Sequence, residues 1–216
     1  MPHRTRPLHS ARHPVHVTLR SAFRPLRHPF VFPTLRRAIL AASRKRSARS
    51  LCQRPERNDF RVVHFSVQGD HLHLLVEARD KQALSNGMRG LSVSIARRLN
   101  ALVRRRGRVF ADRWHGRALT TPRAVRHALV YVLANHRKHG SRRVGVDPYS
   151  SAPYFSAFRG LGGRTPLEHD PRSVPRALAL AKDEPSGSCT PRTWLLRTGW
   201  AQHSFISISD APSGST

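Results

Sequence analysis

The sequence predicts an α+β fold, in which helices cover an antiparallel sheet, and three observations favour it. Residues 14–20 and 60–78 alternate apolar with polar side chains, as half-buried strands do. Residues 81–106 and 121–140 instead carry apolar side chains at a spacing of three and four, which is typical of amphipathic helices. The predicted elements follow one another as β-α-β-β-α-β-α. The first six form the split βαβ, or ferredoxin-like, pattern, and one helix is appended.

The first strand and the first helix are separated by a loop with several prolines. Residues 14–20 read Pro-Val-His-Val-Thr-Leu-Arg, so their apolar side chains share one face of the predicted strand. After the loop, apolar side chains from Leu35 to Ala42 recur at helical spacing. This recurrence predicts a basic helix over residues 33–50.

Residues 60–78 are predicted to form a β-hairpin, with Gly69-Asp70 as a two-residue type II′ turn. This turn aligns the apolar faces of the two strands, which are Val63, Phe65 and Val67 on one and Leu72, Leu74 and Val76 on the other. It also sets three cross-strand pairs: Ser66 with His73, Gln68 with His71, and His64 with Leu75. The opposite face then gathers six polar side chains: His64, Ser66, Gln68, His71, His73 and Glu77.

The longest predicted helix covers residues 81–106 and stops at Gly107. Its apolar stripe is Leu84, Met88, Leu91, Ile95, Leu99 and Leu102. Residues 109–119 predict a weaker strand. The last helix is predicted to begin at Thr121-Pro122, an N-cap followed by proline at the first helical position, and to end at Gly140. Its stripe is Val125, Ala128, Leu129, Val132, Leu133 and His136.

The charge of the chain indicates a polyanionic partner. Lysines and arginines number 39 against 12 aspartates and glutamates, a formal net charge of +27, and the usual partner of such a surplus is nucleic acid. The sequence has no run of about 18 apolar residues, so no membrane span is predicted. The two cysteines form no C-x-x-C pair, which suits a reducing cytoplasm. The acid-free opening is also typical of an organelle transit peptide, but residues 15–20 are predicted to be a strand of the domain.

The composition divides the chain into three parts. We expect a flexible basic tail over residues 1–13, one domain over residues 14–158, and a linker with a C-terminal tail over residues 159–216. The linker is rich in Gly, Pro and Ser. The tail carries a small apolar patch of Trp194, Leu195, Leu196 and Trp200.

Two histidines and one tyrosine are the candidate catalytic residues. His71 and His73 lie on one strand face, about 7 Å apart along the chain, which is close enough to share a metal ion. Because the chain has 14 histidines in 216 residues, about one such pair is expected by chance. The alternative to a metal-binding pair is therefore two histidines on a solvated strand face. Tyr131 lies off the apolar stripe of the last helix, on the side that carries His127, Asn135 and Lys138.

Residues 67–76, with His-Leu-His at their centre, resemble the His-hydrophobic-His (HUH) strand of the single-tyrosine transposases. These form the insertion-sequence-200-like group, which includes the REP-associated tyrosine transposases. Asp70 departs from the family, in which many members have asparagine at this position, and a turn residue should tolerate the change. The resemblance extends over residues 14–158 and includes four more segments: residues 96–100, 107–114, 131–140 and 147–151.

The resemblance implies a transposase that cleaves and rejoins single-stranded DNA at hairpin or palindromic element ends, through a 5′-phosphotyrosine on Tyr131. It implies a divalent metal, Mg²⁺ or Mn²⁺, bound by His71 and His73. Asn135 is preferred to His127 as the third ligand, because the family places a polar ligand one turn after the tyrosine. Lys138 is the candidate cation for making the phenol reactive.

Basic side chains are expected to follow the DNA backbone, and Gln68 and His127 are expected to support the site. The family includes monomers and dimers, so the sequence leaves a homodimer open. The candidate DNA-binding residues are Arg97, Arg98, Arg104, Arg105, Arg113, Arg117 and Lys138.

Two other functions remain open from the sequence. A catalytically inactive derivative that only binds structured nucleic acid would need the net charge, but neither a metal nor the tyrosine. A zinc-dependent hydrolase that uses His64, His71 and His73 would act without Tyr131.

Overall fold

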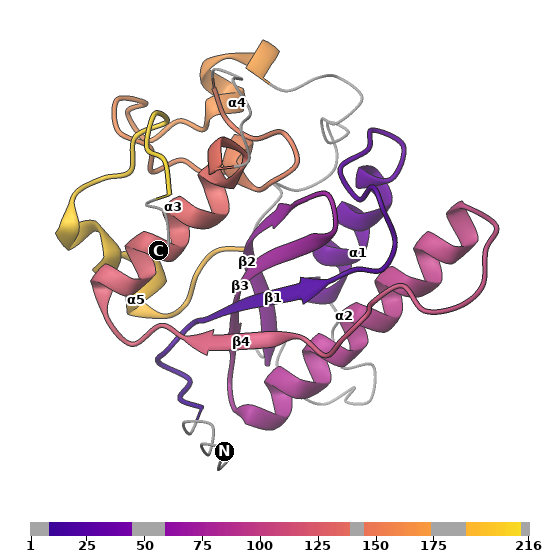
Figure 1. Cartoon of the computed structure of the whole chain (residues 1–216). Helices are drawn as coiled ribbons and strands as arrows, with labels where there is room; N and C mark the ends of the chain where they lie inside the picture. Colours follow the sequence, from indigo (N-terminus) through magenta and orange to yellow (C-terminus); the bar gives the residue numbers. More distant parts are fainter. Residues whose placement is uncertain (1–8, 45–58, 139–144, 174–188, 213–216) are drawn as a thin grey trace.

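The protein is built around a four-stranded antiparallel sheet, as a computed structural model describes it for residues 9–44, 59–138, 145–173 and 189–212 (Figure 1). The order across the sheet is β2-β3-β1-β4, and each neighbouring pair is antiparallel. The predicted α+β fold with a split βαβ arrangement is therefore confirmed. The strands are β1 (Val15–Arg20), β2 (Phe60–Val67), β3 (His71–Ala78) and β4 (His115–Ala118).

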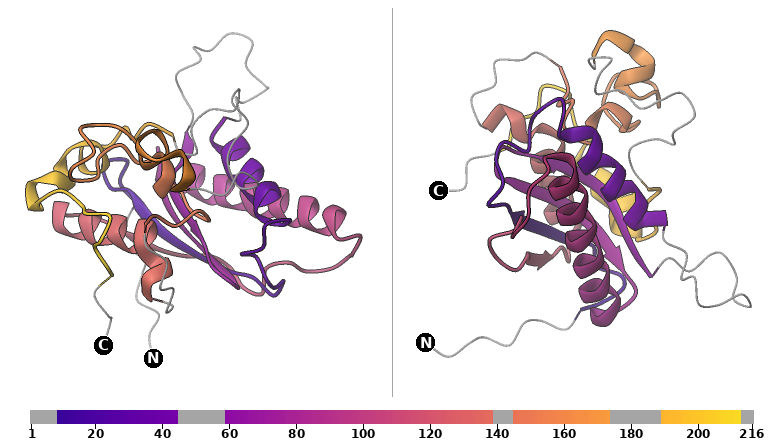
Figure 2. Two further views of the ribbon diagram at one scale, coloured as in Figure 1. Left: turned by 90° about the horizontal axis from the view of Figure 1, so that it is seen from above. Right: turned by 90° about the vertical axis from the view of Figure 1, so that its right-hand side faces the viewer.

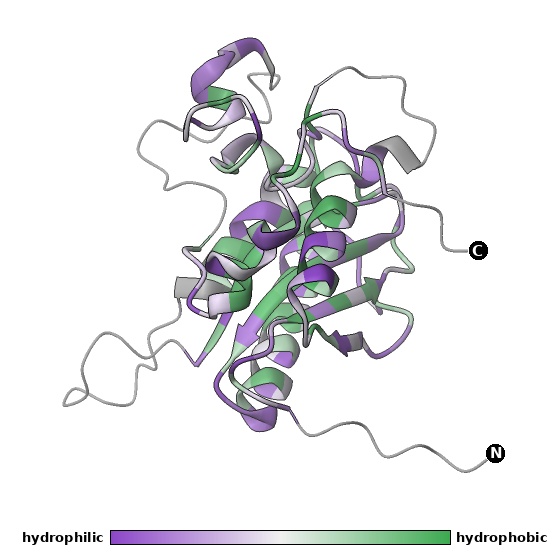
Figure 3. Ribbon diagram, turned by 90° about the vertical axis from the view of Figure 1, so that its left-hand side faces the viewer, coloured by the Kyte–Doolittle hydropathy of each residue, from purple (hydrophilic) through white to green (hydrophobic). Residues whose placement is uncertain are grey.

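Helices cover both faces of this sheet (Figure 2). Helices α1 (Phe32–Arg44) and α2 (Lys81–Leu102) share one apolar core with the sheet, whereas α3 (Pro122–Lys138) packs in a second core that includes Leu75. Hydrophobic residues accordingly line the strands and the sides of the helices that face them (Figure 3). In the described part of the chain, no helix combines the length and the apolar character needed to cross a bilayer.

Helix α2 ends earlier than predicted, at Leu102, because the chain turns back on itself there. Arg104 has a φ of 50°, and the Asn100 side chain donates a hydrogen bond of 2.9 Å to the carbonyl of Gly107. Leu102 is half-buried, so it does not complete the apolar stripe. The rest of the predicted stripe is buried: Leu84, Met88, Leu91, Ile95 and Leu99.

The ends of the other two long helices are only partly described. Helix α3 begins at Pro122 as predicted, and the Thr121 hydroxyl accepts a hydrogen bond from the backbone N–H of Ala124. Helix α1 occupies the predicted place up to Arg44. The predicted continuation over residues 45–50 and the predicted stop at Gly140 lie outside the described residues.

The strand predicted over residues 109–119 is shorter in the structure. Only His115–Ala118 pairs continuously with β1, while Phe110 makes an isolated bridge with Ser21. Residues 111–114 between them form a bend and irregular backbone, so the two contacts do not merge into one strand.

The β2–β3 hairpin has the predicted register, but not the predicted turn. Ser66 pairs with His73 and His64 with Leu75, while the N–H of Gln68 donates to the carbonyl of His71. The type II′ turn is wrong, because Gly69 lacks the positive φ that this turn requires. The turn is instead held from outside, where its two carbonyls accept hydrogen bonds from the backbone of residues 21–26.

Val63 does not lie on the face predicted for it. The register shifts between Val62 and His64, as it does at a β-bulge, so Val63 turns to the α3 side and packs near Leu75. Val62 takes its place on the face that α1 and α2 cover.

The C-terminal residues pack on α3. Leu195, Leu196, Trp200 and Ile206 are buried in the core that α3 shares with the sheet. Short helices carry this part of the chain: α4 (Pro166–His169), α5 (Trp194–Arg197), and the 3-10 helices η1 (Ala152–Tyr154), η2 (Pro171–Ser173) and η3 (Gly199–His203).

A buried carboxylate attaches this C-terminal segment to the sheet. Glu77 on β3 forms an ion pair with Arg61 on β2, and both side chains are at most 8% exposed. The same carboxylate accepts hydrogen bonds from the backbone N–H of Arg192 and from both the N–H and the hydroxyl of Thr193. Every charge in the cluster therefore has a partner, which a buried ion pair requires.

We expect Glu77→Ala to lower the free energy of unfolding by about 3–5 kcal/mol, because it leaves the Arg61 guanidinium buried without its counter-charge. Arg79→Ala removes an exposed ion pair with Asp59 and should cost no more than about 1 kcal/mol. Urea unfolding of the two variants measures the difference. Equal costs would contradict the role given to Glu77.

Candidate active site

The two histidines of the HUH-like strand point to the same side of the sheet as α3. Their ring centroids are 4.7 Å apart, with the rings nearly perpendicular. His73 is 4% exposed, and its Nδ1 lies 3.2 Å from the hydroxyl of Thr18 on β1. The neighbouring strand thus fixes the orientation of this imidazole.

Tyr131 on α3 lies directly against His73. The ring centroids are 4.8 Å apart at an interplanar angle of 85°, and the phenol is half-buried. The structure therefore brings together the tyrosine and the paired imidazoles, although 58 residues separate Tyr131 from His73 in the chain.

His16 is a further member of this ring cluster that sequence reasoning missed. Its ring centroid lies 5.6 Å from that of Tyr131 and 5.4 Å from that of His73. Alternation along β1 places His16 on the α3 side of the sheet, but the sequence does not reveal that β1 adjoins β3. Burial, and secondarily the charge of Arg117, lowers the pKa of His16 to about 4, so it is uncharged at neutral pH.

His71 is oriented by a carboxylate at the turn. Its Nδ1 donates to Asp70 at 2.7 Å, and the other oxygen of Asp70 lies 2.5 Å from Arg24. The hydrogen bond from His71, with the nearby Arg24, holds the pKa of Asp70 below its ordinary value. A carboxylate in this position fixes the tautomer of a metal-binding histidine and leaves Nε2 as its ligand atom.

Asn135 is the residue that the sequence proposes as the third ligand. It is fully buried, and neither atom of its amide has a hydrogen-bond partner among the described residues. Helix α3 is kinked just before it, because Ala134 has a φ of −118° and a ψ of 15°. Two imidazoles and an amide oxygen are a donor set that fits a divalent cation such as Mn²⁺.

The residue after Asn135 faces the histidine end of the site. His136, which the sequence placed on the apolar stripe, is buried and lines a cavity of about 440 Å³ together with His71, Gln68 and Arg27. Gln68 donates a hydrogen bond of 2.7 Å to the hydroxyl of Ser66, so it braces the end of β2.

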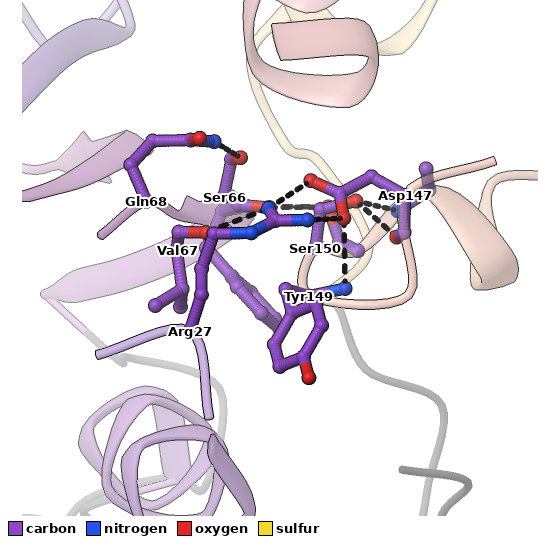
Figure 4. A network of polar contacts seen from close by, with 10 residues as sticks. Arg27, Ser66, Val67, Gln68, Asp147, Tyr149 and Ser150 are labelled. Carbon is purple, nitrogen blue, oxygen red and sulfur yellow. Dashed lines mark hydrogen bonds and ion pairs between the residues drawn. The ribbon is translucent and has the colours of Figure 1, made fainter. Parts of the chain in front are cut away.

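An ion-pair network holds the loop before α1 against this end of the sheet (Figure 4). Arg27 makes two hydrogen bonds to Asp147, at 2.8 and 2.9 Å, and a third to the carbonyl of Val67. Its guanidinium also lies 4.5 Å from the ring centroid of Tyr149. The network therefore ties together the loop that carries Arg24, the end of β2 and the segment after α3.

The outer side of Tyr131 opens to a second cavity, of about 630 Å³, which His16, Arg117 and His127 also line. Burial raises the pKa of the Tyr131 phenol, so the group is protonated at neutral pH. His127 is exposed on this outer side, and so does not accompany His71 and His73. Arg117 and Arg126 are the described arginines that line this cavity, and Arg126 forms an ion pair with Asp210.

The other predicted DNA-binding residues are spread over the molecule. Arg97 and Arg98 are exposed on α2, in the layer opposite to Tyr131. Arg104 and Arg105 are exposed beyond the end of α2, where Arg105 lies over the ring of Phe23. Arg113 is also exposed. The side chain of Lys138, at the end of α3, lies outside the described part of the structure.

His64 belongs to a different environment. Its Nδ1 lies 3.2 Å from the hydroxyl of Ser151, and its ring packs edge-on against Phe155. Within the described ranges, no three His, Cys, Asp or Glu side chains are placed to bind one metal ion. The zinc site of His64, His71 and His73 is therefore not formed.

Two comparisons with known proteins found a match. A family model described as "Transposase IS200 like" matches residues 25–117. A solved structure of a REP-associated tyrosine transposase bound to a REP hairpin is similar, with a TM-score of 0.52 and 17% sequence identity, over 87% of this chain and 97% of that one. No curated protein matches.

We expect acid to destabilise the protein through His64, whose pKa burial lowers to about 4. Below about pH 6.5 the unfolded chain binds a proton at this histidine, whereas the native imidazole stays unprotonated. The free energy of unfolding therefore falls by about 3 kcal/mol between about pH 6.5 and 4. His64→Leu should reduce this acid dependence in denaturant unfolding, leaving the part due to His16, whereas His115→Leu, at an exposed position, should leave it unchanged. The same slope in both variants would contradict the assignment.

Proposed function

We propose that the chain is an IS200-like transposase, which the match over residues 25–117 supports. We further propose that it cleaves and rejoins single-stranded DNA with Tyr131 as the nucleophile. The observation that carries this proposal is the contact between the Tyr131 ring and the His73 ring, at 4.8 Å. A phosphate bound beside this ring pair would be near both the nucleophile and the metal-binding pair.

In the proposed reaction, the Tyr131 oxygen attacks the scissile phosphorus and loses its proton. A bond forms between the phenol oxygen and phosphorus, the bond from phosphorus to the 3′ oxygen breaks, and that oxygen leaves as a 3′-OH with a proton. The 5′-phosphotyrosine retains the energy of the broken bond. A 3′-OH can therefore attack it in the reverse step and join the strand to a new end.

The surroundings of Tyr131 define what activation it needs. Because burial raises the pKa of the phenol, attack requires that positive charge near the phosphate favour loss of the proton. Arg117 lines the cavity on the outer side of the phenol and supplies such a charge for the incoming phosphate. Lys138, the cation that the sequence proposes for this role, has its side chain outside the described residues.

A divalent metal, Mg²⁺ or Mn²⁺, would be bound by His71, His73 and Asn135. When bound, it polarises the scissile phosphate and stabilises the charge that develops on its oxygens. Asp70 and Thr18 hold the two imidazoles in place through their Nδ1 atoms, at 2.7 and 3.2 Å. The buried amide of Asn135, which has no other partner among the described residues, supports its role as the third ligand.

We propose single-stranded DNA next to a hairpin or palindrome as the substrate, in the cytoplasm. The net charge of +27 supplies the electrostatic attraction to the DNA backbone. The similar solved structure is of a transposase bound to a REP hairpin, which favours a hairpin partner for this chain as well.

We expect Tyr131→Phe to abolish formation of a covalent protein–DNA adduct, because the nucleophilic oxygen is removed. The measurement incubates a labelled single strand from the DNA flanking the gene with protein and Mn²⁺, and follows adducts on a denaturing gel. Tyr149→Phe is the matched control and should still form the adduct. If Tyr131→Phe forms it as readily as the parent protein, the assignment is wrong.

We expect Asp70→Ala to weaken Mn²⁺ binding by about 10- to 100-fold, because the His71 ring loses the carboxylate that orients it. Asp59→Ala removes the same charge at the far end of the sheet, where Asp59 pairs with Arg79, and serves as the control. Calorimetric titration with Mn²⁺ gives both affinities. Equal affinities in the two variants would rule out an orienting role for Asp70.

A further inference from the structure

A cavity lies at the end of the sheet opposite to the candidate active site. It has a volume of about 830 Å³ and is open to solvent. Its walls come from the residues before β1, the start of β2, the end of β3 and the first residues of α5. We call it the Trp194 cavity, after the aromatic residue on its rim; the side chains that matter here are Arg12, Arg79, Arg192 and Trp194.

Trp194 is exposed although the fold holds it firmly. Its side chain is 53% exposed, whereas Trp200, in the same C-terminal segment, is buried. A Cβ at Gly199 would lie 2.7 Å from the indole, so the absence of a side chain there lets the ring pack flat against the backbone. The preceding Thr193 caps α5 and is bonded to Glu77. The indole is therefore a fixed, solvent-facing aromatic surface.

The rim of the Trp194 cavity is basic. Arg12, Arg79 and Arg192 carry exposed side chains around it. Of the two carboxylates in the cavity wall, Glu77 is neutralised by Arg61 and Asp59 is paired with Arg79. An ordered aromatic ring among exposed arginines matches the chemistry of a nucleotide: the ring stacks on a base and the guanidinium groups attract the phosphates.

We propose that the Trp194 cavity is a second binding site for single-stranded DNA, in which one base stacks on Trp194 and the flanking phosphates contact Arg12 and Arg192. The choice of DNA as the ligand rests on the function proposed above, while the site itself is separate from Tyr131 and takes no part in the chemistry.

The position of the cavity suits one strand that contacts both sites. His71, His73 and Glu77 alternate onto the same face of β3, and four residues separate His73 from Glu77, a distance of about 13 Å along the strand. A DNA strand that enters the active site can therefore be held at the far end of the sheet by its flanking nucleotides, which would keep the scissile phosphate in place.

The test measures binding without cleavage. Full-length protein carrying Tyr131→Phe is titrated into a fluorescein-labelled, mixed-sequence single strand in EDTA, and anisotropy gives the Kd. Adding Trp194→Ala should raise the Kd about tenfold, within the range measured for loss of one stacked base. Trp194→Phe, which keeps a smaller ring, should raise it less. Phe30→Ala removes an equally exposed aromatic outside the cavity and should leave it unchanged.

A strand with abasic positions separates stacking from charge. The Trp194-containing protein should bind this strand about as weakly as Trp194→Ala binds the normal strand, and Trp194→Ala should show no further loss. Arg192→Glu should weaken the binding of both strands. The proposal is overturned if Trp194→Ala and Phe30→Ala bind the normal strand equally well. It is also overturned if Trp194→Ala lowers the affinity for the abasic strand as much as it lowers the affinity for the normal strand.

The outcome does not depend on catalysis. If Trp194→Ala raises the Kd as expected but adducts form without Tyr131, the proposed nucleophile is overturned and this binding site is retained. If adducts form on Tyr131 but Trp194→Ala leaves the Kd unchanged, the nucleophile is retained and this binding site is overturned. Thermal unfolding of each variant shows whether the fold is kept, and Arg192→Glu tests the site if Trp194→Ala does not fold.

Discussion

The register of the β2–β3 hairpin is the constraint on which the candidate active site depends. Because side chains alternate along β3, a shift of one residue would turn His71 and His73 toward α1 and α2 and away from Tyr131. Contacts on both sides of β3 hold the register: Thr18 on β1 bonds His73, and Ser66 on β2 pairs with it. The turn is held as well, since the backbone of residues 21–26 donates to its carbonyls.

Two buried polar clusters stand at the two ends of the sheet. At the end of the sheet that carries His71, Arg27 and Asp147 join three segments of chain behind the turn. At the other end, Glu77 joins β3 to the segment that carries Trp194. Buried ion pairs contribute little net stability when every partner is present, but a misplaced segment would leave a charge without its partner. We infer that the two clusters determine where each segment packs on the sheet.

Local patterns were enough to predict the parts of the site that belong to one element. The alternation of apolar residues placed His71 and His73 on one face, and the helical stripe left Tyr131 off the core. Features that depend on distant contacts were missed. The bulge that moves Val63 and the kink at Ala134 beside Asn135 have no sequence signal in one chain. The proximity of His16 requires the strand order, and the partners of Glu77 lie 115 residues further along the chain.

We propose above all that a tyrosine on α3 and the imidazoles of β3 act on a common phosphate. Mass spectrometry of the native protein after reaction with single-stranded DNA, nuclease trimming and proteolysis tests it most directly. We expect a nucleotide on the α3 peptide, attached to Tyr131. A nucleotide attached to any other residue would contradict it.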